Sequence, residues 1–130
     1  MTLLLIAHGT LRNPSSAATT EGHATAIRAN GRFRQVVTGY LDQPPLIAEA
    51  LAPLAPPILA IGCFAAPGHH ATRDVAIGLA ARPGNGVSYL GPIGEDEAVP
   101  HLVRRMVEDR LTQERAGALP GVRAGAIGAA

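Results

Sequence analysis

The amino-acid sequence predicts an α/β fold, a three-layer sandwich in which a four-stranded parallel sheet lies between helices. Segments of strand character alternate along the chain with segments of helical character, and this alternation is typical of parallel sheets with helices on both faces. The first segment, 2–7 (TLLLIA), is continuously apolar, as expected for a strand that is covered on both sides. With 130 residues, the chain is expected to form one domain around one core.

Each predicted strand is followed by a predicted helix. The strands are expected at 2–7, 34–40, 58–63 and 87–90. The helices are expected at 15–29, from Pro44 and Pro45 through 51 or 54, at 74–81 and at 95–115. Residues rich in Pro, Gly and Asn separate these segments, because such residues stop helices and form turns. Pro100 lies inside the last helical segment, so the regular helix is expected to begin near it or to kink there.

Two segments are expected to lack regular structure. Residues 64–73 are rich in Gly, Pro and His and are expected to form a loop. The domain is expected to span residues 1–115, followed by an Ala- and Gly-rich tail at 116–130. If the tail docks at all, the apolar residues available for docking are Leu119, Val122 and Ile127.

Composition excludes several classes of function. The 11 basic and 10 acidic residues give a net charge of +1, which indicates no nucleic-acid or membrane-surface partner. Every basic residue is arginine, which excludes a lysine Schiff base and a P-loop lysine. The single cysteine, Cys63, excludes an internal disulfide and a cysteine-based zinc cluster. The apolar start is too short for a signal peptide, and no apolar run could span a bilayer, so a cytoplasmic protein is expected.

Histidines gather at one predicted edge of the sheet. His8 follows the first strand, and His69 and His70 follow the third; ligands of open α/β sheets bind beyond the carboxyl ends of the strands. Because adjacent residues point in different directions, His69 and His70 are not expected to share one task. An imidazole can ligate a borderline divalent metal and can accept a proton near neutral pH. Two imidazoles without a cysteine or carboxylate cluster suit a metal that arrives and leaves.

Other residues near this edge have less specific interpretations. Arg12 and Arg73 are candidates to hold carboxylates, and the alternative is an ordinary solvated arginine. His23 and His101 lie on predicted helices and are expected to face solvent or to be partly packed. Cys63 ends an apolar strand and is expected to be a buried, inert thiol.

Three motifs in order along the chain point to one known family. They are His8-Gly9 after the first strand, residues 68–74 (GHHATRD) after the third, and residues 91–96 (GPIGED) before the last helix. The pattern G-x-H-x-x-x-D is met by Gly68, His70 and Asp74. Over residues 2–112 the chain resembles the short, single-domain form of the CbiX/SirB sirohydrochlorin chelatases, which act in cobalamin and siroheme synthesis.

The resemblance implies a fold, a reaction and a set of site residues. The fold would be chelatase-like, and the reaction would insert a divalent metal, Co²⁺ or Fe²⁺ and in some relatives Ni²⁺, into sirohydrochlorin without an organic cofactor. His8 and His70 would be the catalytic histidines that bind the metal and take up the pyrrole protons. Arg12, Arg73, Gly9 and Gly68 would contact the tetrapyrrole substrate, which carries many carboxylates.

The resemblance also implies an assembly. Long family members contain two such halves in one chain, so a single half is expected to form a homodimer with the macrocycle between equivalent faces. Many relatives carry an acidic residue near Asp42-Gln43, and whether a carboxylate ligand is retained there is left open.

Three alternatives remain open from the sequence. Histidine phosphatases also place a histidine after the first strand, in Arg-His-Gly, but the triplet here is Ala7-His8-Gly9 and lacks that arginine. A non-catalytic tetrapyrrole- or metal-binding protein would use the same residues as a chelatase. A purely structural module would tolerate the loss of His8 or His70 without any effect on a ligand.

Overall fold

The computed structural model describes residues 1–82, 84 and 86–117. Its four strands are β1 (Thr2–Ala7), β2 (Gln35–Tyr40), β3 (Ile58–Gly62) and β4 (Val87–Pro92). Its α-helices are α1 (Ala18–Ala29), α2 (Ile47–Leu51), α3 (Val75–Ala80) and α4 (Val99–Arg115). The tail residues expected to dock, Leu119, Val122 and Ile127, lie outside the described residues.

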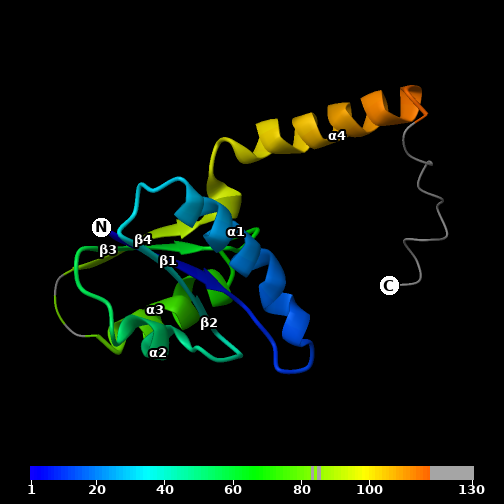
Figure 1. Ribbon diagram of the computed structural model, residues 1–130. Coiled ribbons are helices and arrows are strands. Elements are labelled where there is room, and N and C mark those ends of the chain that lie inside the picture. The colour runs from blue at the N-terminus through cyan, green and yellow to red at the C-terminus, as the bar shows by residue number, and fades with distance from the viewer. Residues whose placement is uncertain (83, 85, 118–130) are drawn as a thin grey trace. The chain divides into compact units, whose positions relative to one another are not determined.

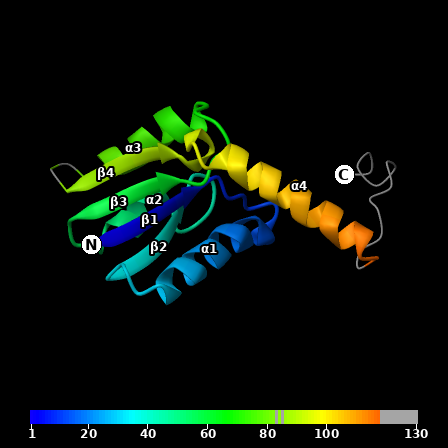
Figure 2. The same ribbon diagram turned by 90° about the horizontal axis from the view of Figure 1, so that it is seen from above.

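The four strands form one parallel sheet in the order β2-β1-β3-β4. Figure 1 shows α1 above this sheet and α2 with α3 beneath it, and Figure 2 gives the same arrangement from above. The predicted α/β class, with a parallel four-stranded sheet flanked by helices, is confirmed. Since β1 pairs with both β2 and β3, Ala7 lies beside Tyr40 and Ile6 lies beside Gly62. The carboxyl ends of three strands therefore meet at one edge.

The sheet is buried on both faces around β1. Leu4 and Ile6 point toward α2 and α3 and belong to a cluster with Ile47 and Val75. Leu3 and Leu5 point the other way and pack with Ala24 of α1 and with other residues. Successive strand residues face opposite sides of a sheet. A strand covered on both sides is therefore expected to be largely apolar, as residues 3–7 are; Thr2, at the start of the strand, is buried as well.

Contacts within the chain divide it into two units, Met1–Asp96 and Glu97–Ala130. The second unit contains α4, none of whose residues is buried. Ion pairs between residues four apart run along this helix, from Arg104 to Glu108 and from Arg110 to Glu114. The regular helix begins at Val99, with Pro100 in its first turn, where a missing backbone N–H has no consequence.

The starts of the first two helices differ from the predicted ones. The helix expected from residue 15 opens instead with a 3₁₀ turn, Pro14–Ala17, before α1 begins at Ala18. The helix expected at Pro45 begins only at Ile47, because the Pro45 carbonyl accepts a hydrogen bond from the Tyr40 N–H at the end of β2. That bond keeps the chain before Ile47 extended against the strand.

The predicted loop 64–73 is wrong at its end. Residues His70–Asp74 form a π-helical turn that continues directly into α3. The Gly68 carbonyl accepts hydrogen bonds from the Thr72 N–H and hydroxyl, and the Asp74 N–H donates to the His69 carbonyl five residues earlier. Residues 69–77 contain no Gly or Pro, so no residue in this segment prevents a helix from starting.

Candidate functional site

The backbone fixes His8 at the centre of the sheet edge. Its carbonyl accepts hydrogen bonds from the N–H groups of Leu41 and Asp42, which follow β2, at 3.1 and 3.0 Å. On the other side of β1, the Cys63 N–H donates to the Ile6 carbonyl at 2.6 Å. The loops after β2 and β3 are thus tied to the end of β1, and the His8 side chain emerges between them.

The contacts of its Nδ1 atom indicate the tautomer of the His8 ring. Nδ1 lies 2.8 Å from the carbonyl oxygen of Gly9 and 3.3 Å from Oδ2 of Asp42. A carbonyl oxygen can only accept, so Nδ1 carries the proton in this arrangement. The Nε2 lone pair is therefore available to a metal ion or a proton.

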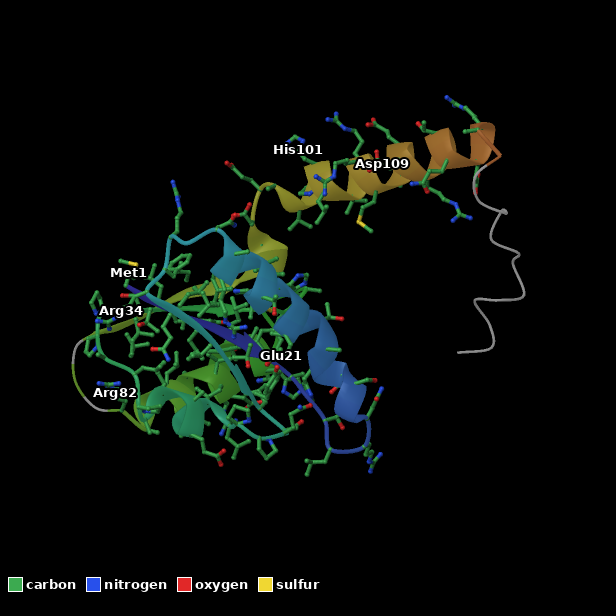
Figure 3. The ribbon with its side chains drawn as sticks, in the orientation of Figure 1. Met1, Glu21, Arg34, Arg82, His101 and Asp109 are labelled. Atoms are coloured by element: carbon green, nitrogen blue, oxygen red, sulfur yellow. The ribbon has the colours of Figure 1, made fainter. Side chains whose placement is uncertain are left out.

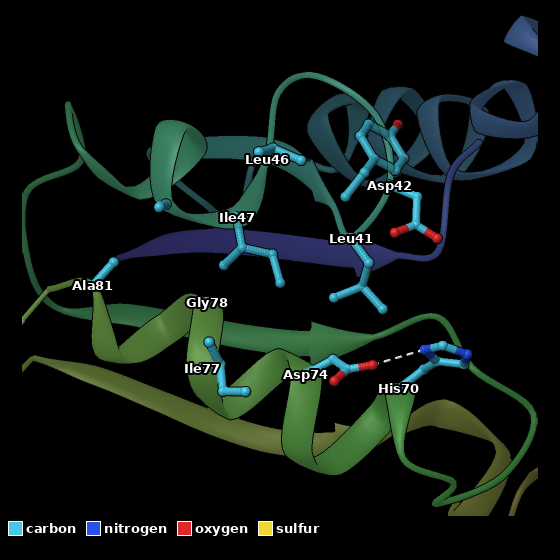
Figure 4. A pocket seen from close by; sticks show the side chains of 11 residues that line it. Leu41, Asp42, Leu46, Ile47, His70, Asp74, Ile77, Gly78 and Ala81 are labelled. Atoms are coloured by element: carbon cyan, nitrogen blue, oxygen red, sulfur yellow. Dashed lines mark hydrogen bonds and ion pairs between the residues drawn. The ribbon is translucent and has the colours of Figure 1, made fainter. Parts of the chain in front are cut away.

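His70 has the same arrangement with a carboxylate partner. Its Nδ1 lies 2.8 Å from Oδ2 of Asp74, one helical turn further on (Figure 4). The Tyr89 hydroxyl on β4 donates to the Ala71 carbonyl and anchors the π-helical turn to the sheet. A carboxylate that accepts from Nδ1 fixes the ring's tautomer and orientation and makes Nε2 a better ligand. Asp74 belongs to the G-x-H-x-x-x-D pattern of the sequence, but the pattern alone does not reveal its contact with His70.

The two imidazoles face each other across the edge of the sheet. The ring centroids of His8 and His70 are 4.5 Å apart, and the planes meet at 81°, an edge-to-face arrangement. Both side chains are accessible, with exposed fractions of 46% and 58%. The expectation that their loops open on one edge agrees with the structure. Their roles in catalysis and metal binding stay predictions.

Gln43 is a site residue whose task the sequence did not reveal. Its Oε1 accepts hydrogen bonds from the Thr10 N–H at 2.8 Å and from the Ser16 hydroxyl at 2.9 Å. It thereby joins the loop after β2 to the loop after β1. Gly9 makes room for it: its φ is +65°, and a Cβ there would lie 2.5 Å from Gln43 Cγ. Of the pair Asp42-Gln43, only Asp42 reaches a histidine among the described contacts.

A cavity of about 520 Å³ opens beside His70, between α2 and α3. Asp42 and Asp74 line it at the histidine end, and Figure 4 shows them on opposite walls. Leu46, Ile47 and Ile77 make the rest of its wall largely apolar. We call this the α2–α3 cavity. Apart from the His70 imidazole and the Tyr40 phenol, the ionisable side chains that line it are the two carboxylates.

The remaining predicted site residues are accessible but make few contacts. Arg12 and Arg73 are exposed, and no described hydrogen bond or ion pair involves their guanidinium groups. Gly68 is also exposed, and a Cβ there would meet nothing within 4 Å, so its contribution is the carbonyl that begins the π-helical turn. His69 is exposed and contributes only its carbonyl to the same turn.

Cys63 is half-buried rather than fully buried. Burial raises the pKa of its thiol, so the sulfur stays protonated near neutral pH and is a poor metal ligand. Among the described residues, no group of three or more His, Cys, Asp or Glu side chains is arranged to hold a metal ion. The site is thus one of two open imidazoles, not a closed metal centre.

Comparisons with known proteins agree with this architecture. A sequence model of the CbiX family matches residues 2–110. A search of curated proteins found no match.

In the part of the chain that the structure describes, no helix is long and apolar enough to cross a membrane.

Solved structures share the fold at low sequence identity. One is CbiX, described as the terminal enzyme for biosynthesis of siroheme in denitrifying bacteria. The TM-score is 0.74 and the sequence identity is 23%, and the match covers 84% of this chain and 47% of that chain. Another is DR2241 from Deinococcus radiodurans, a multi-domain protein similar to chelatases, with a TM-score of 0.75, 23% identity, and 83% and 28% covered. A third, from Marinobacter aquaeolei VT8, is provisionally assigned as a cobalamin biosynthesis CbiX protein, with a TM-score of 0.62, 21% identity, and 86% and 98% covered. The chain spans less than half the length of the first two.

Proposed function

Because the chain belongs to the CbiX family, we propose that it is a sirohydrochlorin chelatase that inserts Co²⁺, Fe²⁺ or Ni²⁺ into the macrocycle. The observation that carries the proposal is the pair His8 and His70, whose facing rings are 4.5 Å apart and leave both Nε2 atoms available. A divalent metal and a tetrapyrrole are the substrates. The catalytic groups are side chains, so no organic cofactor is required.

Insertion requires two events at the same place. The metal ion must be held while its water ligands are replaced, and the two pyrrole N–H protons must leave as the macrocycle nitrogens bind the metal. Neutral imidazole nitrogen is a suitable ligand for these metals and a suitable base near neutral pH. His8 and His70 can hold the incoming ion through Nε2 and then accept the two protons at the same atoms once the ion has moved to the macrocycle.

The carboxylates beside the histidines support both events. Asp74 accepts from His70 Nδ1, and Asp42 lies 3.3 Å from His8 Nδ1. A negative charge next to each ring attracts the cation and balances the charge of a protonated imidazole. Because two histidines hold an ion less firmly than a closed four-ligand site, the metal can pass on to the macrocycle.

Arg12 and Arg73 are proposed to meet carboxylates of the substrate, since both are exposed near the site. Gly9 and Gly68 are proposed to let the substrate approach the backbone. The chain covers about half of the longer siroheme enzyme, so we also propose that it acts as a homodimer. Its location is proposed to be the cytoplasm.

The proposal is tested by following the absorbance of sirohydrochlorin during anaerobic incubation with Co²⁺, Fe²⁺ and Ni²⁺. Wild-type protein is expected to exceed the uncatalysed rate with at least one metal. His8→Ala and His70→Ala are each expected to lower that rate at least 10-fold, as expected for loss of an acid–base group. His69→Ala and His101→Ala are matched controls, because neither ring takes part in the pair.

Two results would contradict the proposal. If wild-type protein shifts the macrocycle spectrum without accelerating insertion of any metal, the chain is a binding protein rather than a chelatase. If insertion is accelerated equally by wild type and both alanine variants, the chemistry lies elsewhere on the chain.

A further inference from the structure

A second cavity, of about 580 Å³, lies beside α1, whereas the α2–α3 cavity lies between α2 and α3. We call it the α1 pocket, because the first turns of α1 form much of its wall. Its polar lining residues are His8, Thr10, Ser16, Thr19, Thr20 and His23, and its apolar lining includes Cys63 and Ile93. His8 lines the α1 pocket and His70 lines the α2–α3 cavity, and the two rings lie 4.5 Å apart.

The two cavities differ in chemical character. The α2–α3 cavity is lined by two carboxylates, Asp42 and Asp74, and by no basic side chain other than His70. The α1 pocket is lined by hydroxyls and imidazoles, and no Asp or Glu belongs to its lining. An anionic group is therefore repelled from the first cavity and meets hydrogen-bond donors in the second.

Some hydrogen-bond donors of the α1 pocket already have an acceptor within the chain, and others do not. The Ser16 hydroxyl and the Thr10 N–H donate to Gln43. Within the described part of the chain, no side-chain hydrogen bond of Thr19, Thr20 or His23 occurs. Thr19 and His23 are also exposed, one turn apart on α1, so a ligand can reach both at once.

We propose that the α1 pocket binds carboxylate side chains of the tetrapyrrole, with Thr19 and His23 as hydrogen-bond donors. This inference rests on the proposed function and deepens it. The macrocycle is thereby oriented, with its carboxylate-bearing edge toward α1 and away from Asp42 and Asp74, while its centre lies at the histidine pair. Arg12, two residues after Thr10, adds a positive charge in the neighbouring loop. His23, expected from the sequence to be a helix residue that faces solvent or is partly packed, becomes a substrate-binding residue in this proposal.

The test compares two ligands and two kinds of variant. Affinity is measured by spectroscopic titration with metal-free sirohydrochlorin and with the same macrocycle after conversion of its carboxyl groups to primary amides. Thr19→Val and His23→Phe are each expected to raise the Kd for the acid form about 5- to 10-fold, because a charge-assisted hydrogen bond is lost. The amide form is expected to bind wild type and variants alike. His23→Gln, which keeps a donor, is expected to recover part of the affinity.

Controls make the result specific to the pocket. Thr25→Val removes a hydroxyl from the exposed surface of α1 outside the pocket, and His101→Phe removes an exposed imidazole from α4; neither is expected to change either Kd. Because Thr19 and His23 are exposed, their variants are expected to fold, which thermal unfolding monitored by circular dichroism checks.

Failure of this inference differs from failure of the proposed function. If wild type binds the acid form and Thr19→Val and His23→Phe bind it equally well, the α1 pocket does not receive the carboxylates. If the variants weaken the acid and amide forms by the same factor, the contact does not depend on the negative charge, and the inference is again overturned. If wild type binds neither form, the proposed function itself is wrong.

Discussion

A substitution of Asp74 tests whether the orientation of His70 matters, because it leaves the histidine itself in the chain. It accepts from Nδ1 of His70 and fixes the ring with Nε2 free. Asp74→Asn leaves a side chain of the same size without the charge, and its amide can donate to Nδ1 and favour the wrong tautomer. We expect the rate of metal insertion to fall about 10- to 100-fold, as is typical when the partner of a ligating histidine is changed.

The control for this change is Asp109→Asn, an equivalent substitution on exposed α4, which is expected to leave the rate unchanged. The pH dependence of insertion gives the second readout, because a purely structural effect would lower the rate equally at every pH. A wild-type rate and pH profile for Asp74→Asn would mean that His70 does not need its carboxylate.

Gln43 acts on the loops rather than on the substrate. Gln43→Ala removes the acceptor shared by the Thr10 N–H and the Ser16 hydroxyl. We expect the free energy of unfolding to fall by about 0.5–1.5 kcal/mol, the net contribution of a typical hydrogen bond, because water can reach the partners left behind. Gln43→Glu, which keeps an acceptor of nearly the same shape, is expected to stay close to wild type. Urea unfolding measures both, and equal loss in the two variants would contradict the assigned hydrogen bonds.

At the scale of elements, a carboxylate joins α1 to β2. Glu21, labelled in Figure 3, accepts hydrogen bonds from the hydroxyls of Thr38 and Tyr40 on the strand. Tyr40 is 2% exposed, and burial, with Glu21 beside it, raises the pKa of its phenol, so it remains a donor at neutral pH. This contact holds α1, the wall of the α1 pocket, at the end of β2.

Glu21→Ala would leave both hydroxyls without this acceptor. We expect the free energy of unfolding to fall by about 2–4 kcal/mol, since each partly buried hydroxyl loses its partner. Tyr40→Phe in the Glu21→Ala background should cost much less than in wild type, because its hydrogen bond is already absent. Urea unfolding of the double-mutant cycle is the measurement, and additive losses would contradict the contact.

Sequence patterns predicted some strand and helix boundaries and missed others. The apolar run 2–7 predicted β1 correctly because a strand buried on both faces has no other pattern. The start at His70 was missed because no side chain caps the turn: its first hydrogen bonds go to the backbone carbonyl of Gly68, and a backbone group leaves no signal in the sequence. The late start of α2 was missed for a related reason, since the bond from Tyr40 to the Pro45 carbonyl joins residues that only the folded sheet edge brings together.

The site could be predicted only in part. Strand alternation placed the loops with His8 and His70 at one edge, because parallel strands end on the same side. The sequence could not show that Asp74 orients His70 or that Gln43 joins two loops, because both depend on side-chain directions. Nor could it show that His23 shares a cavity with His8, since helix position alone does not distinguish a pocket wall from open surface.

At the scale of the whole molecule, the histidine pair belongs to one chain. His8 and His70 face each other at 4.5 Å within a single copy, so a homodimer would carry two complete pairs. We expect a solution mass of twice 13.4 kDa by light scattering. We also expect that mixed dimers of His8→Ala and His70→Ala, purified through two different tags, regain no insertion activity.

Mixed dimers of wild type with His8→Ala provide the control and should keep activity in proportion to their intact pairs. Recovery of activity on mixing the two single variants would show that histidines act across the interface instead.

The π-helical turn at His70–Asp74 makes the site sensitive to chain length as well as to side-chain identity. A π turn holds one residue more than the α turn that could replace it. Deleting one residue between Ala71 and Arg73 would allow the turn to become α-helical, with α3 continuing unbroken into it. His70 would then rotate by about 100° around the helix axis, the angle that one residue subtends. A single codon lost here would separate the two imidazoles and would also change the spacing between His70 and Asp74.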